Sequence, residues 1–116
     1  MVIEKAKKII KDKNLLRIYN NPLDAVPGSN ILYTDVWSSM GEENKSEKKE
    51  QDFIGFTVDS DLLSKANDRA IVLHCLPAYR GKEITNEVFE SKRSRIFEQA
   101  ENRMHVQQAL LYRLLS

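Results

Sequence analysis

Short apolar runs, separated by polar stretches, predict strands that alternate with helices along the whole chain. The runs that suit buried strands are Leu15–Tyr19, Asn30–Asp35 and Ala70–Leu73, and the third is the strongest signal. A fourth short strand is predicted at Arg95–Phe97. Strands that alternate with helices in this way favour an α/β fold with a mainly parallel sheet.

Apolar residues at helical spacing predict the elements between these strands. The first is an amphipathic helix that starts at Val2, carries several lysines and ends near Asn14. A basic helix of this kind suits a membrane surface, but lysines on a solvated face are the favoured interpretation. Short helices are predicted at 23–26, 60–66 and 86–90, with caps from Asn20-Asn21 before Pro22, from Asp59 or Ser60 and from Thr85. A long amphipathic helix then carries an apolar stripe formed by Ile96, Phe97, Ala100, Met104, Leu111 and Leu115.

Composition narrows the class of protein. The 116 residues suit one domain, and apolar residues at 41% with charged residues at 30% are ordinary for a soluble globular chain. A net charge of +1 gives no general attraction to nucleic acid or to an anionic membrane. One cysteine excludes an internal disulfide, so we expect a reducing, cytoplasmic setting. No apolar run suits a membrane span or a secretory leader.

Two segments with candidate chemistry follow directly on predicted strands. In parallel sheets, ligands bind beyond the carboxyl ends of the strands, where Asp35 and the pair His74-Cys75 both fall. Asp35 can accept hydrogen bonds from a ligand ammonium group, Ser39 can add an acceptor, and Gly41 lets backbone N–H groups approach an anion. Together they suit a free amino acid, although spacing alone favours a helix cap by Asp35 or Ser38.

The segment His74-Cys75-Leu76-Pro77 invites a nucleophile hypothesis because a cysteine lies beside a histidine. Adjacent side chains on an extended chain point to opposite faces, so His74 is poorly placed to activate Cys75. Two histidines and one cysteine are too few for a convincing metal site. A small buried cysteine at a strand end is the favoured alternative, and Leu76-Pro77 is a candidate cis peptide.

A third candidate is Arg103, at the edge of the apolar stripe of the last predicted helix. Its guanidinium can reach a carbonyl or phosphate oxygen. An ordinary surface arginine or ion pair remains the favoured interpretation of the spacing alone.

Taken together, three segments resemble the ornithine carbamoyltransferase family very closely. They are TDVWSSMG (Thr34–Gly41), HCLPAYRGKEI (His74–Ile84) and AENRMH (Ala100–His105), in family order. The resemblance covers most of the chain and is weakest at 1–14 and 43–52. It implies a Rossmann-like three-layer α/β unit that is incomplete relative to the family. Residues 1–116 would form part of the ornithine-binding domain, including its C-terminal helix, with no second domain.

The resemblance also implies a reaction and the residues that serve it. The side-chain amine of L-ornithine attacks the carbonyl carbon of carbamoyl phosphate, which yields L-citrulline and phosphate. Asp35, Ser39 and Met40 would hold ornithine. Cys75 would stand near the reacting amine and carbonyl, the Leu76 carbonyl would accept from the carbamoyl NH₂, and Arg103 would donate to the carbamoyl oxygen. No cofactor and no metal are implied.

One departure from the family affects activity more than fold. The family's phosphate-binding Ser-x-Arg-Thr and His-Pro-x-Gln motifs do not occur in the chain. We therefore expect it to hold carbamoyl phosphate weakly and to be inactive by itself. Family members are usually homotrimers, which leaves the association of this chain open. The alternatives are a non-catalytic amino-acid-binding or subunit-interaction remnant, a carbamoyltransferase for a related amine, and, least favoured, a cysteine hydrolase.

Overall fold

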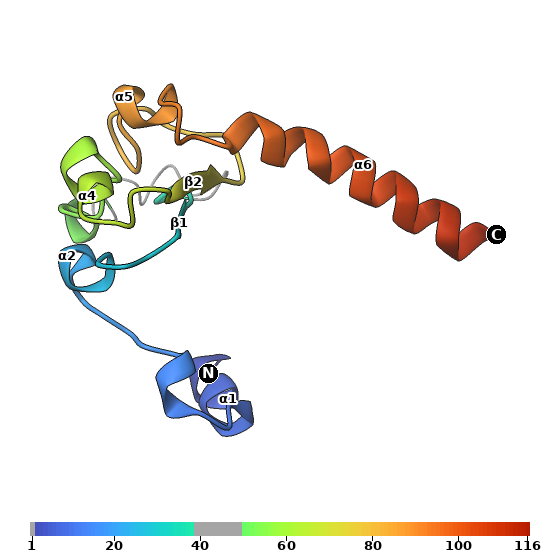
Figure 1. Ribbon diagram of the computed structural model, residues 1–116, viewed down its shortest axis with the longest axis horizontal. Helices are drawn as coiled ribbons and strands as arrows, with labels where there is room; N and C mark the ends of the chain where they lie inside the picture. Colours follow the sequence, from blue (N-terminus) through green and yellow to red (C-terminus); the bar gives the residue numbers. More distant parts are fainter. Residues whose placement is uncertain (1, 39–49) are drawn as a thin grey trace.

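A short parallel sheet lies at the centre of the computed structural model, which describes residues 2–38 and 50–116 (Figure 1). Strand β1 (Ile31–Thr34) pairs with β2 (Ile71–His74). The register places Ile31 opposite Ile71 and Thr34 opposite His74. The predicted α/β class and the parallel pairing are confirmed.

The short helices begin at the capping residues that the sequence indicated. The Asn21 side chain accepts from the Leu23 N–H, and the Asp59 carboxylate accepts from the Leu62 N–H at 2.8 Å. Thr85 caps its helix in the same way. These side chains satisfy backbone donors that the first turn of a helix leaves free. The helices are α1 (Val2–Ile9), η1 (Lys13–Leu15, a 3₁₀ turn), α2 (Pro22–Ala25), α4 (Ser60–Ser64), α5 (Asn86–Phe89) and α6 (Ile96–Leu115).

Apolar side chains from both strands and from the short helices form one core. Val72 in β2 and Ile84 are completely buried, and Ile96 anchors the start of α6 in the same cluster. Burial of such side chains is the main favourable contribution to folding. The buried members are Val26, Leu32, Val58, Leu62, Leu63, Ala66, Ala70, Val72, Ile84, Val88, Phe89 and Ile96.

Two predicted strands are wrong. Leu15 ends the 3₁₀ turn, and residues 16–19 run on without pairing to any described strand, with Ile18 largely exposed. Helix α6 begins at Ile96, inside the second of these predicted strands, and among the described residues a single bridge, between Ser94 and Val72, joins this segment to β2. Short apolar runs fit both helix and strand, so periodicity alone could not separate them.

The N-terminal helix is also shorter than predicted, because α1 ends at Ile9. The Asp12 carboxylate accepts from the Asn14 N–H and starts the separate 3₁₀ turn instead. An aspartate that bonds to nearby backbone competes with continuation of a helix.

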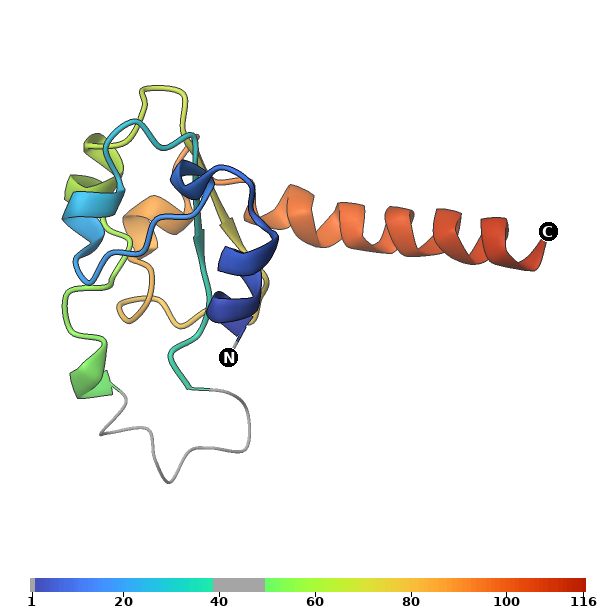
Figure 2. The ribbon, with the colours of Figure 1, turned by 90° about the horizontal axis from the view of Figure 1, so that it is seen from below.

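Helix α6 leaves the body of the molecule and extends outward in both views (Figures 1 and 2). Its first residue, Ile96, is buried, whereas every residue from Glu101 onward is exposed. Across the described parts of the chain, no helix has both the length and the apolar character that crossing a membrane requires.

Candidate functional site

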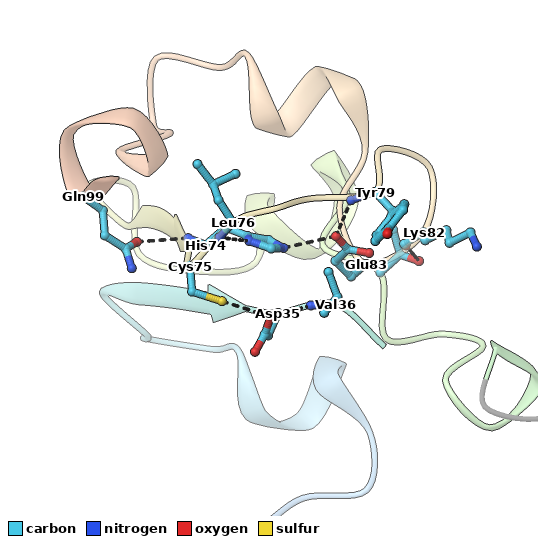
Figure 3. Close-up of polar contacts among 10 residues, drawn as sticks. Asp35, Val36, His74, Cys75, Leu76, Tyr79, Lys82, Glu83 and Gln99 are labelled. Carbon is cyan, nitrogen blue, oxygen red and sulfur yellow. Dashed lines mark hydrogen bonds and ion pairs between the residues drawn. The ribbon is translucent and has the colours of Figure 1, made fainter. Parts of the chain in front are cut away.

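The site is built where the two strands end side by side. Parallel pairing sets Thr34 opposite His74, so the next residues, Asp35 and Cys75, leave the sheet at the same edge. The Cys75 Sγ–H donates to Asp35 Oδ1 at 2.9 Å (Figure 3). Two candidates that lie forty positions apart in the sequence are therefore in direct contact.

This contact fixes the protonation states of both groups. The hydrogen bond from Cys75 lowers the pKa of Asp35 and outweighs the opposing effect of partial burial; the Val36 N–H, at 2.7 Å, lowers it further. The same hydrogen bond, with burial, raises the pKa of the Cys75 thiol. At neutral pH the pair is thus a carboxylate and a neutral thiol, which makes Cys75 a donor and a poor nucleophile. Within the described residues, Asp35 does not cap a helix.

Directly behind this pair, a buried histidine and glutamate support the turn after β2. His74 Nδ1 accepts from the Leu76 N–H at 2.8 Å, so His74 Nε2 carries the proton and donates to Glu83 Oε1 at 3.1 Å (Figure 3). Glu83 Oε1 also accepts from the Tyr79 N–H at 2.6 Å. His74 is 1% exposed and Glu83 is 0% exposed. The hydrogen bonds that His74 Nδ1 and Glu83 Oε1 accept are therefore buried. We call these two residues the buried brace.

The buried brace holds the backbone of the turn that follows Cys75. It holds the N–H groups of Leu76 and Tyr79, which lie on either side of the cis Leu76-Pro77 peptide. Leu76 has a φ of 58°, a conformation that non-glycine residues rarely adopt. The Leu76-Pro77 peptide, a candidate for the cis form in the sequence, is cis in the structure.

Arg103 reaches the same place from α6. A cavity of about 300 Å³ is lined by Tyr33, His74, Cys75, Gln99, Ala100 and Arg103. Arg103 is exposed, and among residues 2–38 and 50–116 no hydrogen bond or ion pair holds its guanidinium. Its charge is therefore available to a ligand oxygen in this cavity.

A larger, mostly apolar cavity of about 510 Å³ lies beside β1 and also includes Asp35 in its lining. Trp37 lines it and stacks on Phe53, with ring centroids 5.9 Å apart. Asp35 therefore lines this apolar cavity and also contacts Cys75, which lines the smaller cavity together with Arg103.

Cys75 and His74 fit neither a metal site nor a nucleophilic pair. A carboxylate oxygen of Asp35, a ring nitrogen of His74 and the Cys75 sulfur lie within 4.8 Å of one another. However, Nδ1 of His74 is occupied by a backbone N–H and Nε2 faces Glu83. A ligating or proton-accepting histidine needs a free ring nitrogen, so His74 serves Cys75 in neither way.

Of the predicted site residues, Cys75 contacts Asp35 and shares a cavity with Arg103, and Leu76 follows Cys75 directly in the turn after β2. Ser39 and Met40 lie outside the described residues. Sequence reasoning did not single out three groups that hold the site: Tyr33, Glu83 and Gln99. Glu83 and Gln99 look like ordinary polar residues in the sequence. Only the fold turns the carboxylate inward and the amide toward the strand ends.

Comparisons with known proteins identify the family of the chain. The family model described as aspartate/ornithine carbamoyltransferase, Asp/Orn binding domain, matches residues 1–114. An ornithine carbamoyltransferase of Prochlorococcus marinus is 70% identical over 115 residues, which are 99% of this chain and 37% of the relative. One from Methanocorpusculum labreanum is 54% identical over 85% of this chain and 32% of its own length. The chain thus spans about a third of the length of the curated relatives it matches.

Solved structures give the same result. The anabolic ornithine carbamoyltransferase of Campylobacter jejuni superposes with a TM-score of 0.75 at 48% identity, over 81% of this chain and 31% of that one. The enzyme of Giardia lamblia gives a TM-score of 0.80 at 28% identity, over 95% and 35%. The chain therefore belongs to the aspartate/ornithine carbamoyltransferase family and corresponds to its Asp/Orn-binding domain.

Proposed function

We propose that this chain supplies the ornithine side of an ornithine carbamoyltransferase site. One observation carries the proposal: Cys75 contacts Asp35 at 2.9 Å and also shares a cavity with Arg103. Cys75 thereby links a carboxylate at the end of β1 to a cavity at the strand ends that also holds a cation from α6. The relatives named ornithine carbamoyltransferase support ornithine, rather than aspartate, as the amino acid.

In the proposed reaction, Asp35 binds the ammonium end of L-ornithine, together with Ser39 and Met40. The pKa of Asp35 is lowered, so its carboxylate is charged at neutral pH and can form charge-assisted hydrogen bonds. Fixing the amino-acid end holds the side-chain amine near the attacking position. Putrescine, which has no carboxylate, would leave this part of the site partly unused.

In the bond-forming step, the side-chain amine nitrogen of ornithine forms a bond to the carbonyl carbon of carbamoyl phosphate. The bond from that carbon to the phosphate oxygen breaks, the amine loses a proton, and phosphate leaves. Arg103 donates to the carbonyl oxygen as it gains negative charge, which favours the transition state over the ground state. The Leu76 carbonyl accepts from the carbamoyl NH₂. Cys75 remains a thiol, so no covalent intermediate on the chain is needed.

The setting we propose is the cytoplasm, where the free Cys75 thiol stays reduced. Residues 1–116 would act as one part of a larger site, because the chain lacks the Ser-x-Arg-Thr and His-Pro-x-Gln motifs expected to hold the phosphate.

Citrulline formation tests this proposal. The purified 116-residue chain with both substrates should give no turnover above background. Adding the separately expressed carbamoyl-phosphate domain of the Prochlorococcus marinus relative should produce citrulline, and Arg103→Ala should abolish that signal. The exposed Arg69 provides the matched control, Arg69→Ala, which should retain it. Turnover by the chain alone, or restored turnover that survives Arg103→Ala, would contradict the proposed roles.

A further inference from the structure

The position of Arg103 depends on how α6 joins the body of the protein. The backbone of β2 holds the start of the helix, because the Val72 N–H donates to the Arg93 carbonyl and the Arg95 N–H donates to the Val72 carbonyl, both at 2.9 Å. Beyond its first turns α6 is exposed. A 20-residue helix is about 30 Å long, so a small rotation at its base displaces every later residue.

A second attachment lies one turn into the helix. The Gln99 side-chain carbonyl accepts from the His74 N–H at 3.1 Å, and its amide NH₂ donates to the Tyr33 hydroxyl at 3.0 Å (Figure 3 shows the contact with His74). One amide therefore joins the last residue of β2, the strand β1 and α6. Each bond fixes a direction as well as a distance.

Gln99 and Arg103 lie on the same face of α6. Residues four positions apart on a helix are neighbours on its surface, and both line the cavity of about 300 Å³ that includes Cys75. Among the described residues, no hydrogen bond or ion pair holds the Arg103 guanidinium. The position of Arg103 relative to Cys75 is therefore set by the orientation of α6.

We propose that Gln99 is a positioning residue that sets the angle of α6 against the strand ends, and thereby sets Arg103 relative to Cys75. Any effect of Gln99 on catalysis rests on the role proposed above for Arg103. Its effect on the angle of α6 is independent of that role.

Residual dipolar couplings of the ¹⁵N-labelled 116-residue chain test this directly, because they report the orientation of α6 relative to the rest of the protein. Gln99→Ala keeps a good helix former but removes both bonds, so α6 should reorient and the His74 amide should exchange roughly fivefold faster. Gln99→Glu should restore the orientation, because its carboxylate accepts from the His74 N–H and the Tyr33 O–H can reverse and donate. The exposed Gln108 provides the matched control, Gln108→Ala, which should change neither.

An unchanged α6 orientation in Gln99→Ala would overturn the proposal, as would a Gln99→Glu chain that behaves like Gln99→Ala. Should Gln99→Ala fail to fold, Tyr33→Phe decides the matter. This variant removes only the exposed hydroxyl that anchors the amide, and an unchanged orientation there would also reject the proposal. Titration of the same wild-type sample with L-ornithine keeps the two ideas apart, since absence of binding would reject the proposed function alone.

Discussion

At the scale of single residues, the hydrogen bond between Cys75 and Asp35 determines what kind of chemistry the site can do. The thiol donates to a carboxylate whose pKa is lowered, and the pKa of the thiol is raised in return. A cysteine in this state orients and donates, whereas nucleophilic cysteines sit where their pKa falls. For the proposed reaction, this geometry favours direct attack of the substrate amine over a cysteine-bound intermediate.

Because Cys75 is the single cysteine, its alkylation by iodoacetamide reports on this contact without interference. Asp35→Asn removes the neighbouring charge, so the pKa of Cys75 should fall and alkylation at pH 8 should speed up. Each unit of decrease raises the thiolate fraction about tenfold below the pKa. Mass spectrometry across a pH series measures the rate, with Asp68→Asn as the exposed control. An Asp35→Asn profile identical to wild type would contradict the assigned protonation states.

Glu83 is the residue on which the turn after β2 depends most. Glu83→Ala leaves the Tyr79 N–H and the His74 Nε2–H without partners inside the protein. We expect the free energy of unfolding to fall by roughly 2–4 kcal/mol, since buried donors without acceptors are costly. Glu83→Gln keeps one acceptor oxygen in place and should cost no more than about 1 kcal/mol. Urea denaturation measures both, and equal losses would show that the acceptor geometry is unimportant.

At the scale of elements, Arg93 joins α4 and the turn that follows it to a segment 23 to 30 positions further along the chain. Its guanidinium donates to the carbonyls of Ala70 at 2.8 Å, Leu63 at 3.1 Å and Asn67 at 2.5 Å. These bonds attach α4 and the turn before β2 to the segment that leads into α6. The fork geometry of arginine permits several such bonds at once, which lysine cannot reproduce.

Arg93→Lys should therefore lower the free energy of unfolding by roughly 2–4 kcal/mol, the loss expected for charged hydrogen bonds to backbone carbonyls. Thermal or urea unfolding gives the size of the loss. Hydrogen exchange should show the earliest loosening in α4 and the turn before β2. The exposed Arg69 allows a matched control, Arg69→Lys, which should leave stability unchanged. A variant as stable as wild type would mean that packing alone holds these segments.

The sequence predicted the starts of the short helices well, because side chains that cap a helix can be identified locally. Asn21, Asp59 and Thr85 identified helix starts because their side chains satisfy backbone donors, a requirement that is independent of the rest of the fold. The strands predicted at Leu15–Tyr19 and Arg95–Phe97 failed because a strand needs a partner, and pairing is a long-range property that a short apolar run does not encode.

At the scale of the whole molecule, the rule for parallel sheets correctly placed Asp35 and Cys75 at one edge. The helical spacing indicated Arg103 as a candidate but favoured an ordinary surface arginine, and resemblance to a family is what gave it a role. Glu83 and Gln99 escaped notice because their roles depend on backbone N–H groups, whose directions only the folded turn and helix define. The chemistry of the site was therefore more visible in the sequence than the residues that support it.

We propose that the edge of the sheet where β1 and β2 end is an amino-acid-binding site. Isothermal titration calorimetry of the 116-residue chain with L-ornithine measures this most directly. We predict saturable binding that weakens at least about tenfold in Asp35→Ala, as expected for loss of a charge-assisted contact, and that is unchanged in Asp68→Ala. A folded chain that takes up no ornithine, or one that binds it equally well after Asp35→Ala, would contradict the claim.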